Sequence, residues 1–345
     1  MSKDNVVIKY LDKTNSEDWN KYVLGHNEGT FFHLLEWKEV IEKSYGHKMY
    51  SLCAFDTDKI VGVLPLGNIK SMLFGNSLSS TPFCVYGGVI ADNEDIALML
   101  EEEAINLAKK IGVEYLELRN LSRKRDDLLT KDLYVTFRKE IDEDSDVNMK
   151  NIPRKQRAMV RKGMKAGLTP VWDDNLDVFY EIYAGSVKAH GTPVFPKKYF
   201  KMLLQVFGDK CKILNLYKDK VPVSSVMSFY FKDEVLPYYA GGTLLARKVK
   251  AFDYMYWVVM EQSREEGLKT FDYGRSKEGT GSYSFKKNWG FVPQSLPYQY
   301  ELISIDVLPE INPLNPKYQL FIKAWQKMPL FMTKIIGPII SKNLG

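Results

Sequence analysis

Thr270 to Tyr300 reads TFDYGRSKEGTGSYSFKKNWGFVPQSLPYQY and joins a short strand to a glycine loop and a cationic aromatic segment. The strand pattern places Phe271 and Tyr273 on one face and Asp272 on the other. Glycines let backbone approach a ligand closely, while arginine and lysine suit phosphate or carboxylate groups. The stretch is either a site for an anionic ligand or a glycine-rich turn with ordinary surface lysines. On the first interpretation, the residues that contact substrate are Arg275, Ser276, Lys277, Gly279, Thr280, Gly281, Tyr283, Phe285, Lys287 and Trp289.

Length and composition indicate a globular protein of two domains. The chain has 345 residues, of which 45% are hydrophobic and 13% aromatic. A net charge of +5 is too small to mark a general nucleic-acid binder. Cys53, Cys84 and Cys211 lie far apart in apolar contexts, which favours buried reduced thiols. The four histidines lack metal-ligand spacing, so we expect no bound metal. No signal peptide or membrane-spanning run is visible, which favours a cytoplasmic location.

The chain repeats one order of strands and helices. In the first copy a polar loop at Gly75 to Ser80 precedes a predicted strand, Phe83 to Ile90, and a long helix ended by Gly112. Three features of this copy recur about 155 positions later: a glycine pair, a helix-ending glycine and the strand that follows it. This constant offset indicates an internal duplication. In the second copy, Tyr239, Gly241 and Gly242 are further candidates for substrate binding.

The predicted fold class is α/β (α+β), with two similar domains, each on a mixed and largely antiparallel sheet. The predicted boundaries give an N-terminal domain at residues 1–149, a C-terminal domain with the signature loop at 150–310, and an amphipathic tail at 311–345.

A basic helix is predicted where the two domains join. Residues 150–165 contain no acid, and an acidic run precedes them at 142–146. Four cations share one helix face and two more lie beside it, so like charges repel unless an anion offsets them. Either the helix pairs with the acidic run, or it binds a phosphate-rich ligand such as an RNA acceptor arm, a nucleotide-linked precursor or a lipid headgroup. The cations are Arg154, Lys155, Arg157, Arg161, Lys162 and Lys165.

Two further segments carry weaker signals. His190 and Thr192 open a stiff loop with two prolines, which suits the wall of a substrate cleft. The tail has an apolar stripe that includes Trp325, then a second stretch of isoleucines, each flanked by lysines. Such segments suit peripheral contact of residues 317–345 with a membrane surface, and equally suit packing against the first domain.

Several of these motifs together resemble a known family. Phe271 to Ser276 (FDYGRS), Lys277 to Gly281 (KEGTG) and Tyr283 to Phe291 (YSFKKNWGF) resemble the C-terminal signature of FemAB-like proteins, in the branch associated with the XrtA/PEP-CTERM exosortase system. The similarity also touches Phe32 to Gly46, the first glycine pair, His190 to Phe200 and the proline-broken tail, and so spans nearly the whole chain.

The resemblance implies two tandem domains of the GCN5-related N-acetyltransferase (GNAT) fold, which is that of acyl-CoA N-acyltransferases. Relatives transfer an amino acid from aminoacyl-tRNA to an amine of a peptidoglycan precursor. The family's Phe-Lys pair maps onto Phe285 and Lys286, and the Lys286 ammonium would stabilise the oxyanion of acyl transfer. Asp272 would orient Arg275 or accept a proton from the attacking amine.

One segment departs from the usual pattern of the fold. Gly241 to Phe252 (GGTLLARKVKAF) lacks the glycine alternation that normally holds coenzyme A, although Arg247, Lys248 and Lys250 could still meet a phosphate. We therefore expect direct amine attack on aminoacyl-tRNA in preference to acyl-CoA, with no tightly bound cofactor. The acceptor would be a nucleotide- or lipid-linked precursor of the cell envelope or of an exopolysaccharide, met in the cytoplasm or at the inner face of the membrane. The alternatives are an acyl-CoA-dependent N-acyltransferase and a non-catalytic module of envelope assembly.

Overall fold

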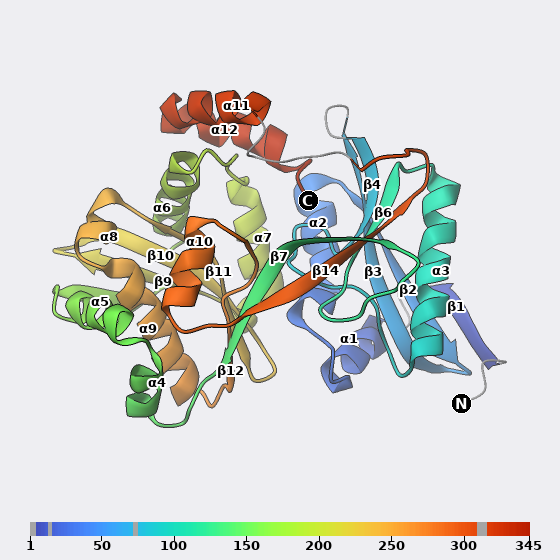
Figure 1. The fold of residues 1–345 in the computed structure, drawn as a ribbon, viewed down its shortest axis with the longest axis horizontal. Coiled ribbons are helices and arrows are strands. Elements are labelled where there is room, and N and C mark those ends of the chain that lie inside the picture. The colour runs from blue at the N-terminus through green and yellow to red at the C-terminus, as the bar shows by residue number, and fades with distance from the viewer. Residues whose placement is uncertain (1–4, 13–15, 72–74, 309–315) are drawn as a thin grey trace. The chain divides into compact units, whose positions relative to one another are not determined.

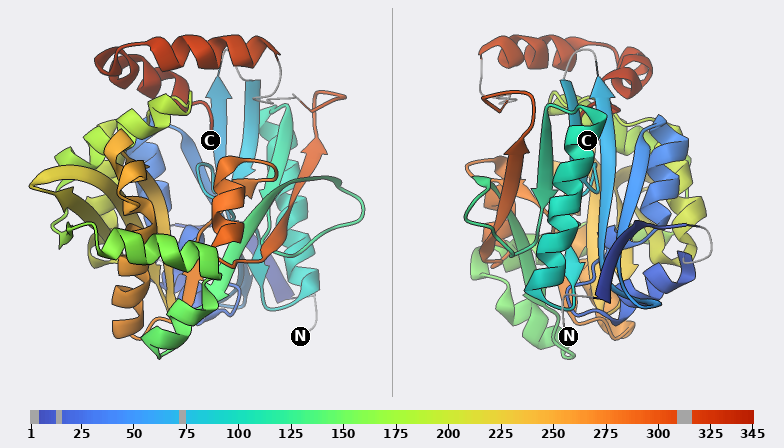
Figure 2. Two further views of the ribbon diagram at one scale, coloured as in Figure 1. Left: turned by 60° about the vertical axis from the view of Figure 1, so that its left-hand side comes forward. Right: turned by 90° about the vertical axis from the view of Figure 1, so that its right-hand side faces the viewer.

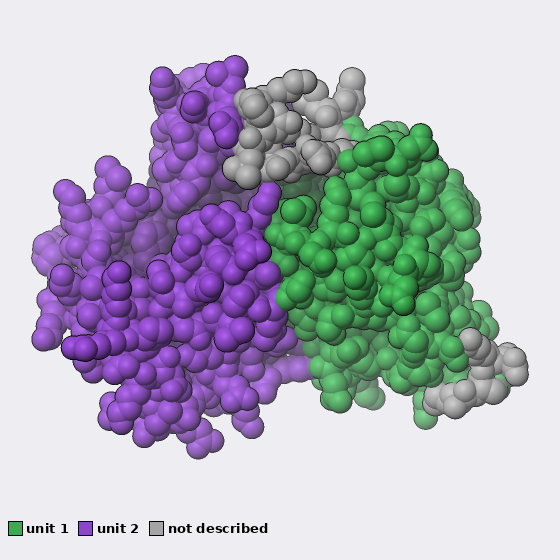
Figure 3. All heavy atoms as spheres, viewed as in Figure 1, with its two compact units in different colours: residues 1–134, 295–310, 342–345 green, residues 135–294, 311–341 purple. Residues whose placement is uncertain are grey.

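The computed structural model describes residues 5–12, 16–71, 75–308 and 316–345. The chain forms two compact units, coloured separately in Figure 3. Unit 1 has residues 1–134, 295–310 and 342–345, and unit 2 has residues 135–294 and 311–341.

Unit 1 is a mixed sheet covered along one face by a long helix, α3 (Figure 2). The strand order is β1-β2-β3-β4-β6-β14; β4 and β6 pair in parallel, and the other neighbours in this order pair antiparallel over their described residues. Apolar residues of α3 and the strands form its core. The elements are β1 (Val6–Tyr10), α1 (Ser16–Gly25), the 3-10 turn η2 (Phe31–His33), α2 (Glu36–Tyr45), β2 (Lys48–Asp56), β3 (Lys59–Ser71), β4 (Gly75–Ser80), β5 (Ile90–Ala91), α3 (Glu94–Ile111), β6 (Tyr115–Arg119) and β14 (Pro293–Leu302).

Unit 2 repeats this plan with the strand order β7-β12-β11-β10-β9-β8, and again one central pair, β11 and β12, is parallel. Alternate residues of β10 and β11 face α9 on one side and α6 on the other. The elements are β7 (Leu129–Glu140), α4 (Ser145–Asn151), α5 (Arg154–Met164), β8 (Leu168–Trp172), α6 (Leu176–Ala189), α7 (Lys197–Phe207), η3 (Gly208–Lys210), β9 (Cys211–Lys218), β10 (Val221–Phe231), β11 (Glu234–Gly242), α8 (Leu244–Lys248), α9 (Ala251–Glu265), β12 (Thr270–Asp272), β13 (Ser276–Lys277), α10 (Gly281–Asn288), α11 (Pro316–Lys327) and α12 (Leu330–Ser341).

The predicted duplication is confirmed by these matching sheets. The predicted helix ends are confirmed too, since Gly112 and Gly267 follow α3 and α9 with left-handed φ values of 66° and 79°. The three cysteines are buried and free, as expected.

Two strand predictions in unit 1 were wrong. β4 covers Gly75–Ser80, where the polar sequence predicted a loop. Ser80 is buried there, and its hydroxyl oxygen accepts a hydrogen bond from the Arg119 N–H at 2.7 Å, which lets a polar side chain lie inside the sheet. Of the strand predicted at Phe83 to Ile90, only Ile90 is in a strand, β5; Phe83 and Gly87 interrupt extended backbone with positive φ values of 68° and 148°.

The units also depart from the predicted domain ranges. The chain leaves unit 1 within β7, because Arg138–Glu140 pair with β12. It returns within β14, because Tyr298–Leu302 pair with β6. Residues 135–149 therefore lie in unit 2 and residues 295–308 in unit 1, whereas the predicted ranges 1–149 and 150–310 assigned them the other way.

The tail packs on unit 2, not on the first domain as one of the two predictions had it. The Trp325 indole N–H donates to the Thr192 carbonyl at 3.1 Å, and the Gln326 amide donates to the Ala189 carbonyl at 3.0 Å. Only residues 342–345 belong to unit 1.

Candidate functional site

The candidate site lies where the parallel strands β11 and β12 part. Their pairing covers only two residue pairs, Glu234 with Thr270 and Val235 with Phe271. Beyond it the chain turns through Gly274, whose φ of 66° suits glycine, into β13 and then α10 (Figure 1). The Thr280 hydroxyl caps α10 by accepting from the Tyr283 N–H at 3.3 Å. The local sequence thus specifies a strand, a loop and a short helix that returns over the strand end.

Lys286 is the central side chain of this site. It is buried, and its ammonium Nζ donates to the Gly274 carbonyl at 2.9 Å and to the Arg275 carbonyl at 3.0 Å. Nζ also lies 5.5 Å from the centre of the Phe137 ring. Because an ammonium has three N–H groups, these two bonds leave one for a further acceptor.

Burial lowers the pKa of Lys286 to about 7, with the Asp272 carboxylate opposing that shift and the Arg275 guanidinium adding to it. The amine is therefore poised to change its charge near neutral pH.

Asp272 fixes the start of the loop. It is buried, and its Oδ1 accepts from the Gly274 N–H at 2.6 Å and from the Thr136 hydroxyl at 3.1 Å. Its Oδ2 lies 3.8 Å from Arg138 Nε. Asp272 thus holds the backbone whose carbonyls hold Lys286. That it accepts a proton from substrate stays a prediction.

A buried carboxylate connects the basic helix to the lysine helix. Asp253, near the start of α9, accepts hydrogen bonds from the Gln156 amide on α5 and from the Trp289 indole N–H, which lies 3.3 Å away. Gly163 lets α5 approach α9 closely, since a Cβ there would lie 2.7 Å from the Lys250 carbonyl oxygen. The cations of α5 and the two cations of α8, Arg247 and Lys248, thus lie on helices that both pack against α9.

The basic run forms α5 as predicted, with one cation used internally. Arg157 donates to the Lys150 carbonyl at 2.7 Å and to the Ile152 carbonyl at 3.0 Å, so it fixes the preceding turn. The alternative of pairing with the acidic run is not what the structure shows: among the described residues, no ion pair involves Arg154, Lys155, Arg161, Lys162 or Lys165.

Several predicted ligand-contacting residues have packing roles. Trp289 is fully buried and belongs to the core rather than to an accessible surface. Phe285 is half-buried against Tyr256 and Tyr273. The Tyr283 hydroxyl donates to Glu278 at 3.3 Å, with Lys287 Nζ 5.4 Å from the Tyr283 ring centre. Substrate contact by the remaining loop residues, Arg275, Ser276, Lys277, Gly279, Thr280 and Gly281, stays a prediction.

The residues predicted on β11 also have structural partners. The Tyr239 hydroxyl hydrogen-bonds with that of Tyr199 at 2.9 Å. A Cβ at Gly241 would lie 2.8 Å from the Ile182 carbonyl oxygen, and one at Gly242 would lie 2.6 Å from Phe252, so close packing explains both glycines.

His190 and Thr192 lie at the end of α6. His190 Nδ1 contacts the Ser186 carbonyl at 2.8 Å, and Thr192 interacts with the tail through Trp325. The structure therefore places both residues beside α11, and their role in substrate binding stays a prediction.

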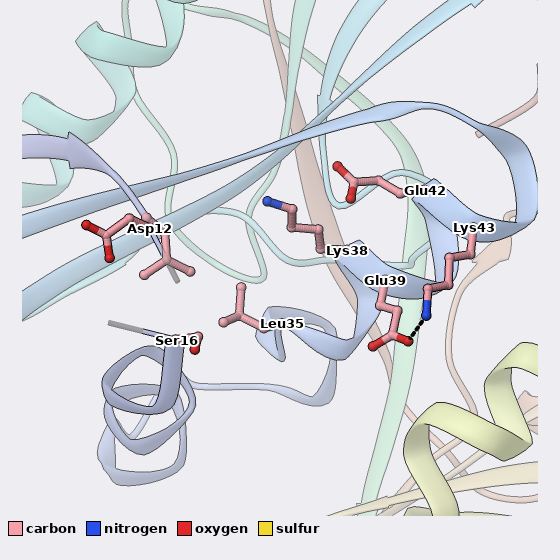
Figure 4. A pocket seen from close by; sticks show the side chains of 8 residues that line it. Asp12, Ser16, Leu35, Lys38, Glu39, Glu42 and Lys43 are labelled. Atoms are coloured by element: carbon pink, nitrogen blue, oxygen red, sulfur yellow. Dashed lines mark hydrogen bonds and ion pairs between the residues drawn. The ribbon is translucent and has the colours of Figure 1, made fainter. Parts of the chain in front are cut away.

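Sequence reasoning missed an open pocket of about 510 Å³ in unit 1, shown in Figure 4. Its walls carry both charges: Glu39 pairs with Lys43 at 2.5 Å, and Glu42 accepts from the Met49 N–H at 3.1 Å. Four of its lining residues, Lys38, Glu39, Glu42 and Lys43, belong to α2, and this run of charges was the signal in the sequence. Within the described ranges, His, Cys, Asp and Glu side chains do not gather into a group that could hold a metal ion.

Comparison with known proteins agrees with the fold. Residues 148–287 match a family model described as an acetyltransferase (GNAT) domain. No curated protein matches the sequence. Among solved structures, FemX superposes with a TM-score of 0.69 at 15% identity, covering 92% of this chain and 100% of that one.

Two other solved structures resemble the chain over most of its length. L-PGS from Bacillus licheniformis has a TM-score of 0.55 at 13% identity, with 93% of this chain and 99% of that one covered. A tandem GNAT protein from the clavulanic acid biosynthesis pathway has a TM-score of 0.55 at 11% identity, with 88% and 100% covered. At these identities the likeness shows the fold. The protein is an α/β chain that consists of two GNAT-like domains in tandem.

Proposed function

We propose that this protein is an acyltransferase that forms an amide bond, by direct attack of an amine on an activated acyl donor, and that the donor is aminoacyl-tRNA. The match to an acetyltransferase domain over residues 148–287 supports acyl transfer as the reaction class. The similar structures include FemX, L-PGS and the C-terminal domain of a putative lysylphosphatidylglycerol synthetase from Agrobacterium fabrum, which favours the aminoacyl form. The acceptor would be an amine of a cell-envelope or exopolysaccharide precursor, linked to a nucleotide or a lipid, as in the resemblance to the exosortase-associated FemAB-like branch.

The observation that carries this proposal is the connection through Asp253. One carboxylate accepts from Gln156 on the basic helix and from Trp289 at the end of the helix that bears Lys286. A phosphate-rich donor bound along α5 would therefore contact a helix that is hydrogen-bonded, through Asp253, to the end of the helix that carries Lys286.

Each site residue has a definite part in the proposed reaction. The amine of the acceptor attacks the acyl carbonyl, the carbonyl oxygen takes up negative charge, and the remaining N–H of the Lys286 ammonium stabilises it. Collapse of this intermediate breaks the bond to the donor oxygen, which leaves with the proton that the attacking nitrogen loses, and the amide remains. The Gly274 and Arg275 carbonyls orient Lys286, and Asp272 orients those carbonyls. The exposed cations of α5, with Arg247 and Lys248, bind donor phosphates.

Donor binding tests the proposal. Purified full-length protein is titrated with charged tRNA and, separately, with acetyl-CoA. We expect tRNA affinity to fall steeply between about 50 and 200 mM salt, because each phosphate contact releases counterions. The variant Arg154→Gln/Arg161→Gln/Lys165→Gln should reduce the slope of log affinity against log salt by about 2. Arg157 is left intact because it holds the backbone.

A matched control removes two exposed cations from unit 1, Lys109→Gln/Lys110→Gln, and should keep the wild-type slope. Binding of the thioester alone would assign the protein to acyl-CoA-dependent N-acyltransferases. Binding of neither donor would overturn the proposal in favour of a non-catalytic envelope-assembly module.

A further inference from the structure

The last helix turns its apolar side chains outward. In α12 the buried residues are Thr333, Gly337 and Ser341, which follow at intervals of four and share one face. Gly337 allows a close approach, since a Cβ there would lie 2.7 Å from the Val194 N atom, and the Ser341 hydroxyl donates to the Val194 carbonyl at 3.2 Å. The helix is thus attached to unit 2 through small and polar residues.

The opposite face of α12 is apolar and exposed to solvent. Phe331 and Ile335, also four residues apart, are 65% and 66% exposed. An ordinary surface helix shows the reverse arrangement, with its apolar face inward. Because its small residues satisfy the contact with unit 2, packing within that unit does not explain why the outer face is apolar.

The preceding helix contributes to the same outer layer of unit 2, beside α6 (Figure 1). In α11, Leu320 is 74% and Phe321 42% exposed, whereas Trp325 points inward and is buried. We define the apolar tail surface as Leu320, Phe321, Phe331 and Ile335. Trp325, the most membrane-like residue by type, is not part of it.

The charges that the tail itself carries have one sign. From Lys317 to Gly345 the sequence has five lysines, Lys317, Lys323, Lys327, Lys334 and Lys342, and no aspartate or glutamate. Lys323 and Lys327 are exposed, whereas Lys334 pairs with Glu181 on α6. A protein partner would usually bring both charges to such an interface, but an anionic lipid surface offers negative charge alone.

We propose that the apolar tail surface binds the surface of an anionic membrane, with Phe331, Ile335, Leu320 and Phe321 entering the headgroup region and Lys323 and Lys327 meeting lipid phosphates. Of the helices that the structure describes, none combines the length and apolar composition needed to cross a bilayer. The proposed contact is an interfacial one. It rests on α11 and α12 alone and does not depend on the donor or the chemistry proposed above.

Vesicle flotation with the full-length protein tests this proposal. The vesicles contain phosphatidylcholine alone or phosphatidylcholine with phosphatidylglycerol. We expect binding to the mixed vesicles only, weakened at least tenfold in Phe331→Ser/Ile335→Ser. Lys323→Gln/Lys327→Gln should bind the mixed vesicles several-fold more weakly.

Two control variants match these changes elsewhere on the protein. Val221→Ser alters another exposed apolar residue of unit 2, and Lys109→Gln/Lys110→Gln removes two exposed cations of unit 1. Both should float as wild type does. Thermal unfolding confirms that each variant is folded.

Three results would overturn the proposal. They are equal binding to both vesicle types, binding that survives Phe331→Ser/Ile335→Ser, and no binding to either vesicle. Concentration-dependent dimerisation of the wild-type protein that the same double variant abolishes would assign the surface to a second copy of the chain instead.

Discussion

The ends of β6 and β12 are equivalent positions in the two units, and they differ in chemistry. At the end of β6, Arg119 is buried and bonds twice to Glu117, with its other N–H groups donating to the Cys84 and Gly345 carbonyls. At the end of β12 the chain makes a glycine loop and a short helix that buries Lys286. One copy of the duplicated strand end is a closed ion pair, and the other holds an amine with a pKa near neutrality.

The two strand ends differ in how the charge of the buried cation is compensated. Glu117 neutralises Arg119 directly, and although burial alone would lower the pKa of Arg119, that carboxylate raises it. Lys286 has carbonyl dipoles as partners, while Asp272 opposes the fall in its pKa only in part. The ion pair at the end of β6 therefore favours stability, whereas the lysine of shifted pKa at the end of β12 favours reactivity.

The largest expected effect is on protein stability, from a change at the end of β6. Arg119→Met leaves Glu117 buried without its cation, which should lower the free energy of unfolding by about 3–5 kcal/mol. Urea denaturation measures this. The activity per folded molecule should not change, because Arg119 has no part in the proposed reaction. A stable but inactive Arg119→Met protein would contradict the claim that the end of β6 serves stability and the end of β12 serves activity.

Lys286 should make stability and turnover depend on pH in opposite directions. Below about pH 7 the folded and unfolded chains both hold its proton; between that pH and the ordinary lysine value of 10.5, only the unfolded chain does. The free energy of unfolding should therefore rise with pH across this window, by at most about 1.4 kcal/mol per pH unit from this residue. Transfer should slow as pH rises through about 7, because the ammonium is lost.

Urea denaturation across pH 7–10 and a pH–rate profile check both effects. Lys286→Met should lack the contribution of this group to the stability slope. An identical slope in the variant would show that the lysine titrates normally.

A smaller effect is expected from Asp272→Asn. The amide oxygen can still accept from Gly274, so the cost in unfolding free energy should be about 1 kcal/mol. The carboxylate charge raises the pKa of Lys286, so its removal should move the alkaline fall in transfer rate to lower pH. An unchanged pH profile would show that Asp272 does not act on Lys286. Thr136→Val, which removes one hydrogen bond and no charge, is the matched control.

The fold was largely predictable because the duplication repeats strong local signals. Helix-ending glycines such as Gly112 and Gly267 act through backbone conformation alone, so they could be recognised without tertiary information. β4 could not be predicted, because Gly75–Ser80 has loop-like residues that are paired within the sheet. The exchange of β7 and β14 between the copies depends on strand pairing over long sequence separations, which no local pattern records.

The site was predictable in part for the same reason. The strand, loop and lysine could be read from Thr270 to Tyr300, but burial could not. Trp289 and Phe285 suggested ligand contacts by residue type, and the structure packs both against α9. Trp325 likewise suggested a lipid contact, although it faces inward and the exposed apolar residues lie beside it.

The most direct test of the central claim is the transfer rate of Lys286→Met, with Lys287→Met as control. The two lysines are neighbours on α10, but Lys286 is buried at the loop carbonyls and Lys287 is exposed. Using whichever donor binds, transfer of a labelled acyl group to a cell-envelope precursor preparation should fall by about 10²–10³ in Lys286→Met and stay near wild type in Lys287→Met. A folded Lys286→Met protein with wild-type turnover would contradict the claim that acyl transfer takes place at the end of β12.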